Sequence, residues 1–288
     1  MLVADAGTDL FGTGRDPGPA ESVADVISAA GGAAVAYTTD LSTEEGARGA
    51  IDAAWARWGR IDAVVHNAGF TLGGKSFQDD SLDRLDALLS INTRAAFALA
   101  SQAWPIMLGQ NYGRLVFTSS SALHGLPRSI PYSIAKASLV GLTRGLAAEG
   151  AAAGIKVNCV EPVGATRMAE NLAESEFRTW FLDRMRPELV SPLVAVLASE
   201  VCPVSGEVLV AGGGRYARTI FGETPGWVSD DPSPDSVLEH LAAITDASHI
   251  EVITDGVHAS AYHAELLGFE PTSPVTVIAG STPANRPS

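Results

Sequence analysis

The stretch from Gly113 to Leu142 contains the side chains best suited to catalysis. An apolar run typical of a strand ends in Ser119–Ser121, and a predicted helix then begins with Tyr132 and Lys136. Residues four apart share one face of a helix. An ammonium beside a phenol lowers the phenol pKa toward neutrality, and a serine hydroxyl nearby can bind a carbonyl or alcohol oxygen. These groups predict proton transfer at a substrate oxygen while hydride moves at the neighbouring carbon.

Alternating strand and helix patterns supply the frame for these side chains. The short apolar runs are nearly continuous and rich in β-branched residues, which predicts an α/β fold with a doubly wound parallel sheet covered on both faces. Such sheets bind ligands beyond the carboxyl ends of their strands. The predicted strands are Leu2–Asp5, Ala33–Thr38, Ile61–Val65, Arg114–Thr118, Ile155–Val160 and Glu207–Ala211. The predicted helices are Ala20–Ala30, Thr43–Gly59, Leu82–Leu108, Pro131–Ala153 and Pro192–Ser199.

Further motifs occur in a fixed order around the Tyr132 segment. Asp40-Leu41 follows one strand, His66-Asn67-Ala68-Gly69 follows the next, and Asn92 lies on the long helix. In this order, over roughly residues 1–220, the sequence resembles the short-chain dehydrogenase/reductase family, and within it the hydroxyacyl-CoA dehydrogenase branch. The resemblance implies a Rossmann-like fold and an NAD-dependent oxidoreductase. It would interconvert a secondary alcohol and a ketone, with a 3-hydroxyacyl thioester as the expected substrate.

The same resemblance implies the catalytic roles. Tyr132 would be the general acid and base, Lys136 would lower its pKa and hold the nicotinamide ribose, and Asn92 would anchor a water in the proton relay. The serine is ambiguous, because counting from the strand end selects Ser120 and counting back from Tyr132 selects Ser119. We prefer Ser120, since strand ends are better anchored than loops.

The expected cofactor contacts also follow from the resemblance. Asp5, at the end of the first strand, would accept the adenosine ribose hydroxyls, and its charge would repel a 2′-phosphate, which favours NAD over NADP. Asp40 and Leu41 would flank the adenine. The remaining expected contacts are Asn67, Ala68 and Gly69 at the adjacent ribose and Pro162, Val163 and Gly164 at the carboxamide.

The glycines Gly12, Gly14 and Gly18 only look like a phosphate-binding loop. Their spacing, G-x-G-x-x-x-G, is one residue longer than the dinucleotide fingerprint, and only a short strand precedes it. The sequence Asp16-Pro17-Gly18-Pro19 argues against a helix opening at the last glycine. We therefore predict a flexible loop here.

The family's own phosphate turn, T-G-x-x-x-G-x-G after a first strand, has no counterpart in this chain. The sheet is therefore expected to be N-terminally incomplete and to lack a central strand. Three explanations compete: the unit lies upstream, the apolar run Pro274–Gly280 fills the gap, or the chain is a relative that no longer binds a dinucleotide. The last option leaves an alternative function, a non-redox homologue acting as a binding or regulatory protein or as an isomerase-type catalyst.

The composition limits the classes of partner and indicates how the chain is divided into domains. The net charge of −14 argues against nucleic acid and anionic membranes as partners. Ten acidic residues and one base fall within residues 223–288, which predicts a dehydrogenase domain over 1–222 and a short acidic C-terminal appendix over 223–288. Four of the six histidines lie in this appendix at spacings that predict surface residues and no metal site.

Cysteine use and the absence of targeting patterns predict a reduced, cytoplasmic setting without a signal peptide or membrane span. Cys159 lies in an apolar run and is predicted to be a buried strand residue. By resemblance, the expected partners are a small-molecule substrate and further copies of the chain, in a homodimer or homotetramer.

Overall fold

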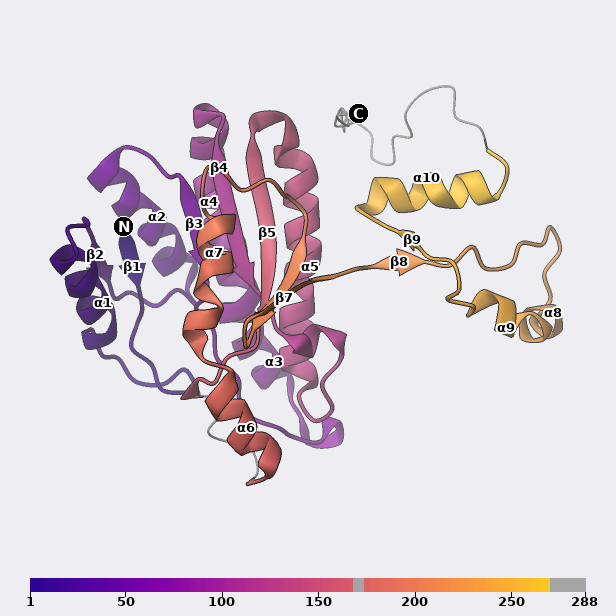
Figure 1. Ribbon diagram of the computed structural model, residues 1–288, viewed down its shortest axis with the longest axis horizontal. Coiled ribbons are helices and arrows are strands. Elements are labelled where there is room, and N and C mark those ends of the chain that lie inside the picture. The colour runs from indigo at the N-terminus through magenta and orange to yellow at the C-terminus, as the bar shows by residue number, and fades with distance from the viewer. Residues whose placement is uncertain (168–173, 270–288) are drawn as a thin grey trace. The chain divides into compact units, whose positions relative to one another are not determined.

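The computed structural model describes residues 1–167 and 174–269. The chain forms two compact units, Met1–Arg218 and Thr219–Ser288. The division falls four residues before the boundary predicted between residues 222 and 223. Figure 1 shows the helices and strands of both units.

The main sheet of the first unit has the strand order β3-β4-β5-β6-β7. Strands β3 to β6 are parallel, and the side chains of β4 and β5 are almost all buried. Strand β7 follows β6 after Gly213 and Gly214, which both have positive φ, as a two-residue turn between strands requires. The strands are β3 (Ala63–His66), β4 (Gly113–Thr118), β5 (Ile155–Pro162), β6 (Val208–Gly212) and β7 (Arg215–Thr219).

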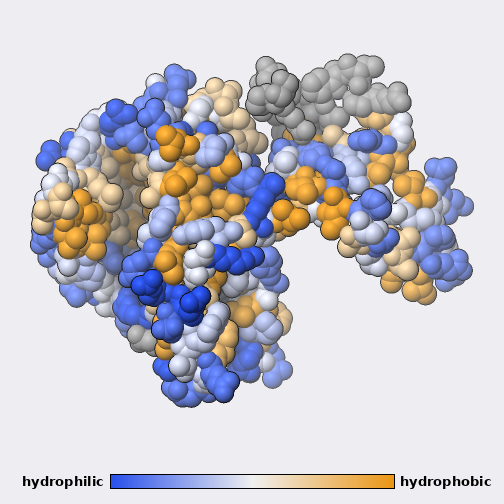
Figure 2. Space-filling model, in the orientation of Figure 1, coloured by the Kyte–Doolittle hydropathy of each residue, from blue (hydrophilic) through white to orange (hydrophobic). Residues whose placement is uncertain are grey.

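Strands β1 (Leu2–Ala4) and β2 (Val35–Tyr37) form a separate parallel pair. Among the described residues, no strand ladder joins β1 to β3. The sheet is thus interrupted, as expected from a missing central strand. The prediction that both faces are covered is wrong for β3, because Val65 is 43% exposed. Apolar residues are also exposed on helix α1 (Gly18–Ala29), and a hydrophobic patch lies over this helix in Figure 2.

Helices flank the main sheet. Helices α4 and α5 contact β3, β4 and β5, whereas α7 packs against Val116, Val160 and Ala211 and crosses the near face in Figure 1. The predicted helix 82–108 is continuous, but a π-turn at Ser90–Arg94 interrupts its regular hydrogen bonding. The remaining helices of this unit are α2 (Glu44–Trp58), α3 (Leu82–Leu89), α4 (Ala95–Gln110), α5 (Ile130–Gly150), α6 (Glu176–Arg184) and α7 (Ser191–Leu197).

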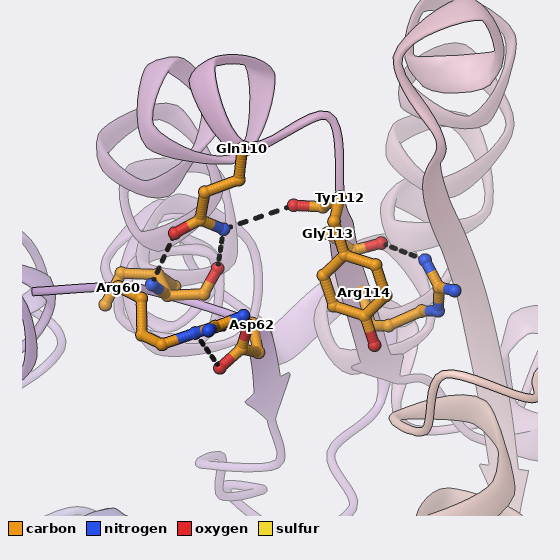
Figure 3. Close-up of polar contacts among 7 residues, drawn as sticks. Arg60, Asp62, Gln110, Tyr112, Gly113 and Arg114 are labelled. Atoms are coloured by element: carbon orange, nitrogen blue, oxygen red, sulfur yellow. Dashed lines mark hydrogen bonds and ion pairs between the residues drawn. The ribbon is translucent and has the colours of Figure 1, made fainter. Parts of the chain in front are cut away.

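Polar contacts fix the amino ends of β3 and β4 relative to one another (Figure 3). The Gln110 amide accepts the Ile61 N–H at 3.0 Å and donates to the Ile61 carbonyl at 2.7 Å. The Arg114 N–H donates to the Asp62 carbonyl at 2.9 Å, and its guanidinium donates to the Gly113 carbonyl at 2.8 Å. This end of the sheet is rigid and lies opposite the carboxyl ends, where parallel sheets bind ligands.

The second unit is small and mainly helical. Strand β8 (Gly222–Glu223) pairs antiparallel with β9 (Glu251–Val252). The helical segment that begins at Pro234 breaks at His240, whose ring stacks on Trp227 with ring centroids 4.3 Å apart. The predicted strand Pro274–Gly280 lies outside the described residues. The helices are α8 (Pro234–Glu239), α9 (Leu241–Ile244) and α10 (Gly256–Leu266).

In the part of the chain that the structure describes, every helix is too short or too polar to span a bilayer. Nor do three or more His, Cys, Asp or Glu side chains converge there on a possible metal position. Both cysteines are free and buried, and the prediction that Cys159 is a buried strand residue is confirmed.

Candidate active site

The first turns of α5 bring Tyr132 and Lys136 to the carboxyl end of β4. The Lys136 ammonium lies 5.6 Å from the centroid of the Tyr132 ring. It donates a hydrogen bond to the Thr118 carbonyl at 2.8 Å, and only 4% of the residue is exposed. The helix therefore presents a phenol and a buried ammonium on one face, next to the last residue of the strand.

The two candidate serines point to different partners. The Ser119 hydroxyl is buried and donates to the Lys136 carbonyl at 2.8 Å, so it fastens β4 to α5. The Ser120 hydroxyl accepts the Ala122 N–H at 3.2 Å and lies near enough to the Tyr132 phenol to act against the rise of its pKa. Ser120 therefore stands where a hydroxyl could share a substrate oxygen with Tyr132, as the count from the strand end predicts.

The pKa values of the pair differ from the sequence-based expectation. Burial raises the pKa of Tyr132 above its ordinary value, and the hydrogen bond from Ser120 only partly opposes this. Burial also lowers the pKa of Lys136 to about 8. Burial of the phenol is the largest cause at Tyr132, and Lys136 is not among the causes, so the lowering expected from Lys136 stays a prediction.

Asn92 and Gly69 border the same site. The Asn92 side chain is fully buried, and its Nδ2 donates to the carbonyls of Leu88 at 3.0 Å and Phe70 at 3.4 Å. Its Oδ1 has no hydrogen-bond partner among the described residues. A Cβ atom on Gly69 would lie 2.5 Å from this oxygen and 3.5 Å from Lys136 Nζ. A side chain at this position would clash with Asn92, so glycine is what lets the backbone pass this close to the two polar groups.

His66 is a site residue that the sequence analysis missed. It is 1% exposed at the end of β3, and its Nε2 lies 3.1 Å from the Ile91 carbonyl in the π-turn. Because a carbonyl can only accept, Nε2 carries the proton. Burial and the nearby Lys136 ammonium lower the pKa of His66 to about 3, so the ring is neutral. The available signal was its place directly before Asn67, at a strand end.

The buried His66 predicts a specific loss of stability in acid. The pKa of His66 is about 3 in the folded chain and 6.5 in the reference state. Between these two pH values the unfolded chain therefore binds a proton at His66 that the folded chain does not bind. Stability therefore falls as the pH drops below 6.5. The variant His66→Gln keeps an N–H for the Ile91 carbonyl and does not titrate. Urea unfolding at pH 7 and pH 5 should show that, on going from pH 7 to pH 5, the variant loses roughly 2 kcal/mol less stability than the wild type does. Equal losses in both proteins would contradict this.

The residues expected at the adenosine end lie on the smaller sheet. The Asp5 carboxylate is exposed and accepts the Gly7 N–H at 2.7 Å. Asp40 pairs with the Arg15 guanidinium at 2.6 Å. Partial burial acts to raise the pKa of Asp40, but hydrogen bonds from Ser42 and Arg15 bring it below its ordinary value. Leu41 is buried. No strand ladder among the described residues connects this group to the Tyr132 site.

The other expected cofactor residues follow β3 and β5. Asn67 and Gly69 are exposed and Ala68 is half-buried, directly after His66. The Val163 N–H donates to the Ala211 carbonyl at 2.8 Å, which fixes the segment after β5 beside β6. Pro162 and Gly164 are half-buried on either side of it. Both segments leave the main sheet at the carboxyl end that carries Ser120.

The glycine-rich loop after β1 has its own hydrogen bonds. The Asp9 carboxylate accepts the N–H groups of Phe11 at 2.8 Å and Thr13 at 2.9 Å. Because the Asp9 carboxylate already accepts these amides, they are not available to a phosphate, as the sequence predicts for this loop. The expectation that no helix opens at Gly18 is wrong: α1 begins there, because prolines are tolerated in a first helical turn.

The family model described as enoyl-(acyl carrier protein) reductase matches residues 1–215. The chain belongs to the short-chain dehydrogenase/reductase family. It is 36% identical over 254 residues to the short-chain type dehydrogenase/reductase Rv0148 of Mycobacterium tuberculosis, covering 88% of this chain and 87% of that one. It is 32% identical over 255 residues to the mouse peroxisomal multifunctional enzyme type 2, covering 86% of this chain but 34% of that one.

Solved structures of the family show the same fold. A short-chain dehydrogenase from Mycobacterium avium superposes with a TM-score of 0.73 at 31% identity, covering 88% of this chain and 89% of that one. The full-length peroxisomal multifunctional enzyme type 2 of Drosophila melanogaster gives a TM-score of 0.73 at 26% identity, covering 93% of this chain and 49% of that one. The fold class is therefore the Rossmann-like α/β fold of this family.

The described residues fit only part of the nicotinamide cofactor that the family uses. The buried ammonium of Lys136 and the unpartnered Asn92 oxygen suit the polar nicotinamide ribose. The pyrophosphate would need free backbone amides at a helix N-terminus. In the loop after β1, the Phe11 and Thr13 amides donate to the Asp9 carboxylate, and the Gly18 amide at the start of α1 donates to the Asp16 carboxylate, so these amides are not free for a phosphate.

Separate replacement of the two serines tests their assignment. Ser120→Ala should lower turnover by about 10-fold or more, because the hydroxyl facing Tyr132 is lost. Ser119→Ala should mainly lower stability, by about 1 kcal/mol, because the bond to the Lys136 carbonyl is lost. Steady-state kinetics and urea unfolding of both variants give the two readings. A larger loss of turnover in Ser119→Ala would reverse the assignment.

Proposed function

We propose that this chain is an NAD-dependent oxidoreductase that interconverts a secondary alcohol and a ketone, with a 3-hydroxyacyl thioester as substrate. The observation that carries the proposal is the convergence of Ser120, Tyr132 and Lys136 at one strand end. Relatives support the substrate class: the yeast peroxisomal hydratase-dehydrogenase-epimerase is 33% identical over 251 residues, of which this chain spans 27%. An acetoacetyl-CoA reductase of Acinetobacter is 35% identical over 186 residues.

The protein groups act on the substrate oxygen, while a bound nicotinamide would supply or accept the hydride at the neighbouring carbon. Ser120 accepts the Ala122 N–H, so its own proton remains available for the phenol or for the substrate oxygen. Because the pKa of Tyr132 is raised, the phenol is protonated at neutral pH. This protonation state suits donation to a ketone oxygen and therefore favours the direction of reduction.

Lys136 and Asn92 would serve the proton path and the cofactor. Lys136 uses one of its N–H bonds for the Thr118 carbonyl and has others for a ribose hydroxyl or a water. The unpartnered Asn92 Oδ1 could accept a hydrogen bond from a water that relays a proton. Asn67, Ala68 and Gly69 would border the ribose, and Pro162, Val163 and Gly164 would contact the carboxamide.

The proposed preference for NAD depends on charge near the adenosine ribose. The exposed carboxylate of Asp5 stands at the end of β1, where it would accept ribose hydroxyls and repel a 2′-phosphate. Arg15 is a cation that could attract such a phosphate, but it is paired with Asp40. Asp40 and Leu41 would flank the adenine.

The cytoplasm is the proposed compartment. We propose residues 1–222 as the catalytic domain and 223–288 as its acidic extension, in a homodimer or homotetramer. Exposed apolar side chains on α4 and α5, Phe97, Leu108 and Ile134, support self-association through these helices. Light scattering at micromolar concentration should show more than one chain per particle. A monomer at that concentration would contradict the expectation.

The alternative, a non-redox homologue, rests on the cofactor side of the site. Strands β1 and β3 share no ladder, and the amides of the loop between Asp9 and Thr13 are already occupied. A protein with this site could still use Tyr132 as an acid in an isomerisation without hydride transfer. The alternative therefore predicts that the chain does not bind NADH.

One experiment separates the two functions. The chain is titrated with NADH by fluorescence and assayed with a series of 3-hydroxyacyl-CoA and 3-ketoacyl-CoA substrates. A second version, extended at its N-terminus by a strand and a T-G-x-x-x-G-x-G turn of the family's pattern, is assayed in parallel. Turnover in either version, abolished by Tyr132→Phe, supports the dehydrogenase. No NADH binding and no turnover in both folded versions would overturn it.

A further inference from the structure

Two exposed cations, Lys75 and Arg128, come from adjoining loops at the end of the sheet that carries Tyr132. Lys75 lies in the loop after β3, and Arg128 lies between β4 and the start of α5. The Lys75 N–H donates to the Arg128 carbonyl at 2.6 Å. A Cβ atom on Gly74 would lie 3.7 Å from Arg128 Cβ and 4.0 Å from its Nε. The arginine side chain therefore runs beside the loop that carries Lys75.

Both side chains are free to hold an anion. The chain has three lysines, and Lys136 and Lys156 each donate to a backbone carbonyl. In the part of the chain that the structure describes, the Lys75 ammonium and the Arg128 guanidinium have no hydrogen bond or ion pair. The chain as a whole carries −14 and repels anions. An anionic ligand therefore needs local cations such as these two.

Arg128 adopts a backbone conformation that is costly for its type. Its φ is +65°, and Asn111 is the other described non-glycine residue with a positive φ. The Ser129 N–H donates to the Leu126 carbonyl at 3.1 Å, which closes a turn with Pro127 and Arg128 at its centre. A positive φ at the second central position is usually met by glycine or asparagine. Such strain collects at ligand sites, so an arginine in this place points to a role for its side chain.

The contacts around the two loops hold the cations in place. The Arg84 guanidinium pairs with the Asp80 carboxylate at 2.7 Å and donates to the Leu72 carbonyl at 3.1 Å, which fixes the loop after β3. In the other loop, the Leu126 N–H donates to the Ser133 hydroxyl at 3.0 Å, which fixes that loop to α5. Both loops are ordered without a ligand, and this order lowers the entropic cost of binding one.

Exposed apolar side chains flank the two cations. Phe77, two residues after Lys75, is 74% exposed, and Leu126, two residues before Arg128, is 47% exposed. Apolar surface beside free cations suits a ligand with an uncharged arm and an anionic end. A coenzyme A thioester is such a ligand, because an uncharged pantetheine arm separates its thioester from its phosphates.

We propose that Lys75 and Arg128 form a subsite that binds the phosphates of the coenzyme A part of the substrate. The proposal rests on the proposed function, because it assumes that a thioester reaches Tyr132. A guanidinium can donate two parallel N–H bonds to phosphate oxygens, and an ammonium adds a compact charge. The subsite holds the carrier and does not touch the reacting carbon, so it should act on KM and leave kcat nearly unchanged.

Kinetics with two thioesters of the same 3-hydroxyacyl group test the subsite. Lys75→Gln and Arg128→Asn should each raise KM for the coenzyme A thioester by about 10-fold, the effect of one charge-assisted hydrogen bond. Asparagine tolerates a positive φ, so Arg128→Asn should fold. The N-acetylcysteamine thioester ends before the phosphates, and its KM should be the same in wild type and in both variants.

Arg57→Gln is the matched control, because it removes an exposed cation at the end of α2, which leads to the opposite end of the sheet. It should leave KM for both thioesters unchanged. An equal rise of KM for both thioesters in the Lys75 and Arg128 variants, or no rise for the coenzyme A thioester, would overturn the subsite and leave the proposed function intact. No turnover of any thioester would count against the proposed function, and the binding measurement then decides on the subsite.

That measurement is a calorimetric titration with free coenzyme A, phosphopantetheine and pantetheine. Coenzyme A should bind wild type more tightly than pantetheine, and each variant should reduce this preference by about 10-fold. Phosphopantetheine also occurs on acyl carrier proteins. If it binds as tightly as coenzyme A, the subsite holds the phosphate next to the pantetheine; if it binds more weakly, the subsite holds the nucleotide phosphates. Equal affinity of wild type for coenzyme A and pantetheine would overturn the proposal.

Discussion

Replacing Tyr132 with phenylalanine is expected to lower turnover by about 10²–10⁴-fold, the usual contribution of positioned acid–base catalysis. In the proposed mechanism the phenol is the group that exchanges a proton with the substrate oxygen, with Ser120 beside it. The ring of phenylalanine preserves the packing at the start of α5. The fold should therefore remain, and the effect should appear in kcat with little change in KM.

Two measurements make the Tyr132→Phe result specific. Circular dichroism and urea unfolding should match wild type within about 1 kcal/mol, since a partly buried hydroxyl with one hydrogen bond is lost. Glu149→Ala, an exposed substitution near the other end of the same helix, serves as the control and should keep wild-type turnover. Turnover close to wild type in a folded Tyr132→Phe variant would remove the dehydrogenase mechanism, whichever cofactor is used.

The order of strands and helices could be predicted from sequence because each apolar run is buried in one sheet and each helical pattern flanks it. The break between β1 and β3 was also predicted, because the sequence shows no counterpart of the family's first strand and glycine turn. The start of α1 at Gly18 could not be predicted. Prolines indicate the end of a helix unless it is known that they lie in its first turn. Nor does a residue pattern distinguish a π-turn at Asn92 from the helix around it.

The site was predictable in its members but not in its energetics. Spacing alone left Ser119 and Ser120 open, and only the contacts with Lys136 and Tyr132 separate them. The direction of the Tyr132 pKa shift depends on how deeply the phenol is buried, which no spacing reveals. His66 escaped notice for the same reason, because a histidine has functional meaning here only through its burial and its bond to Ile91.

Lys136 is the position where the second large loss of activity is expected. Lys136→Met keeps the length and apolar stem of the side chain but removes the ammonium that lies 5.6 Å from the Tyr132 ring. Turnover should fall by at least about 10²-fold, because the proton path and the ribose contact depend on that charge. Binding of NADH should weaken as well, since the same N–H groups serve both tasks.

The stability of Lys136→Met provides a reading that does not depend on activity. The unfolded lysine keeps its proton up to about pH 10.5, whereas burial makes the folded one release it near pH 8. Between these values the unfolded chain holds more protons, so wild-type stability should rise with pH by up to roughly 3 kcal/mol relative to the variant. Urea unfolding at pH 8 and pH 10 should show this difference in slope. Identical slopes would mean that the ammonium is not desolvated.

A stable, inactive Lys136→Met would show that the buried charge costs folding free energy and is retained for its chemistry.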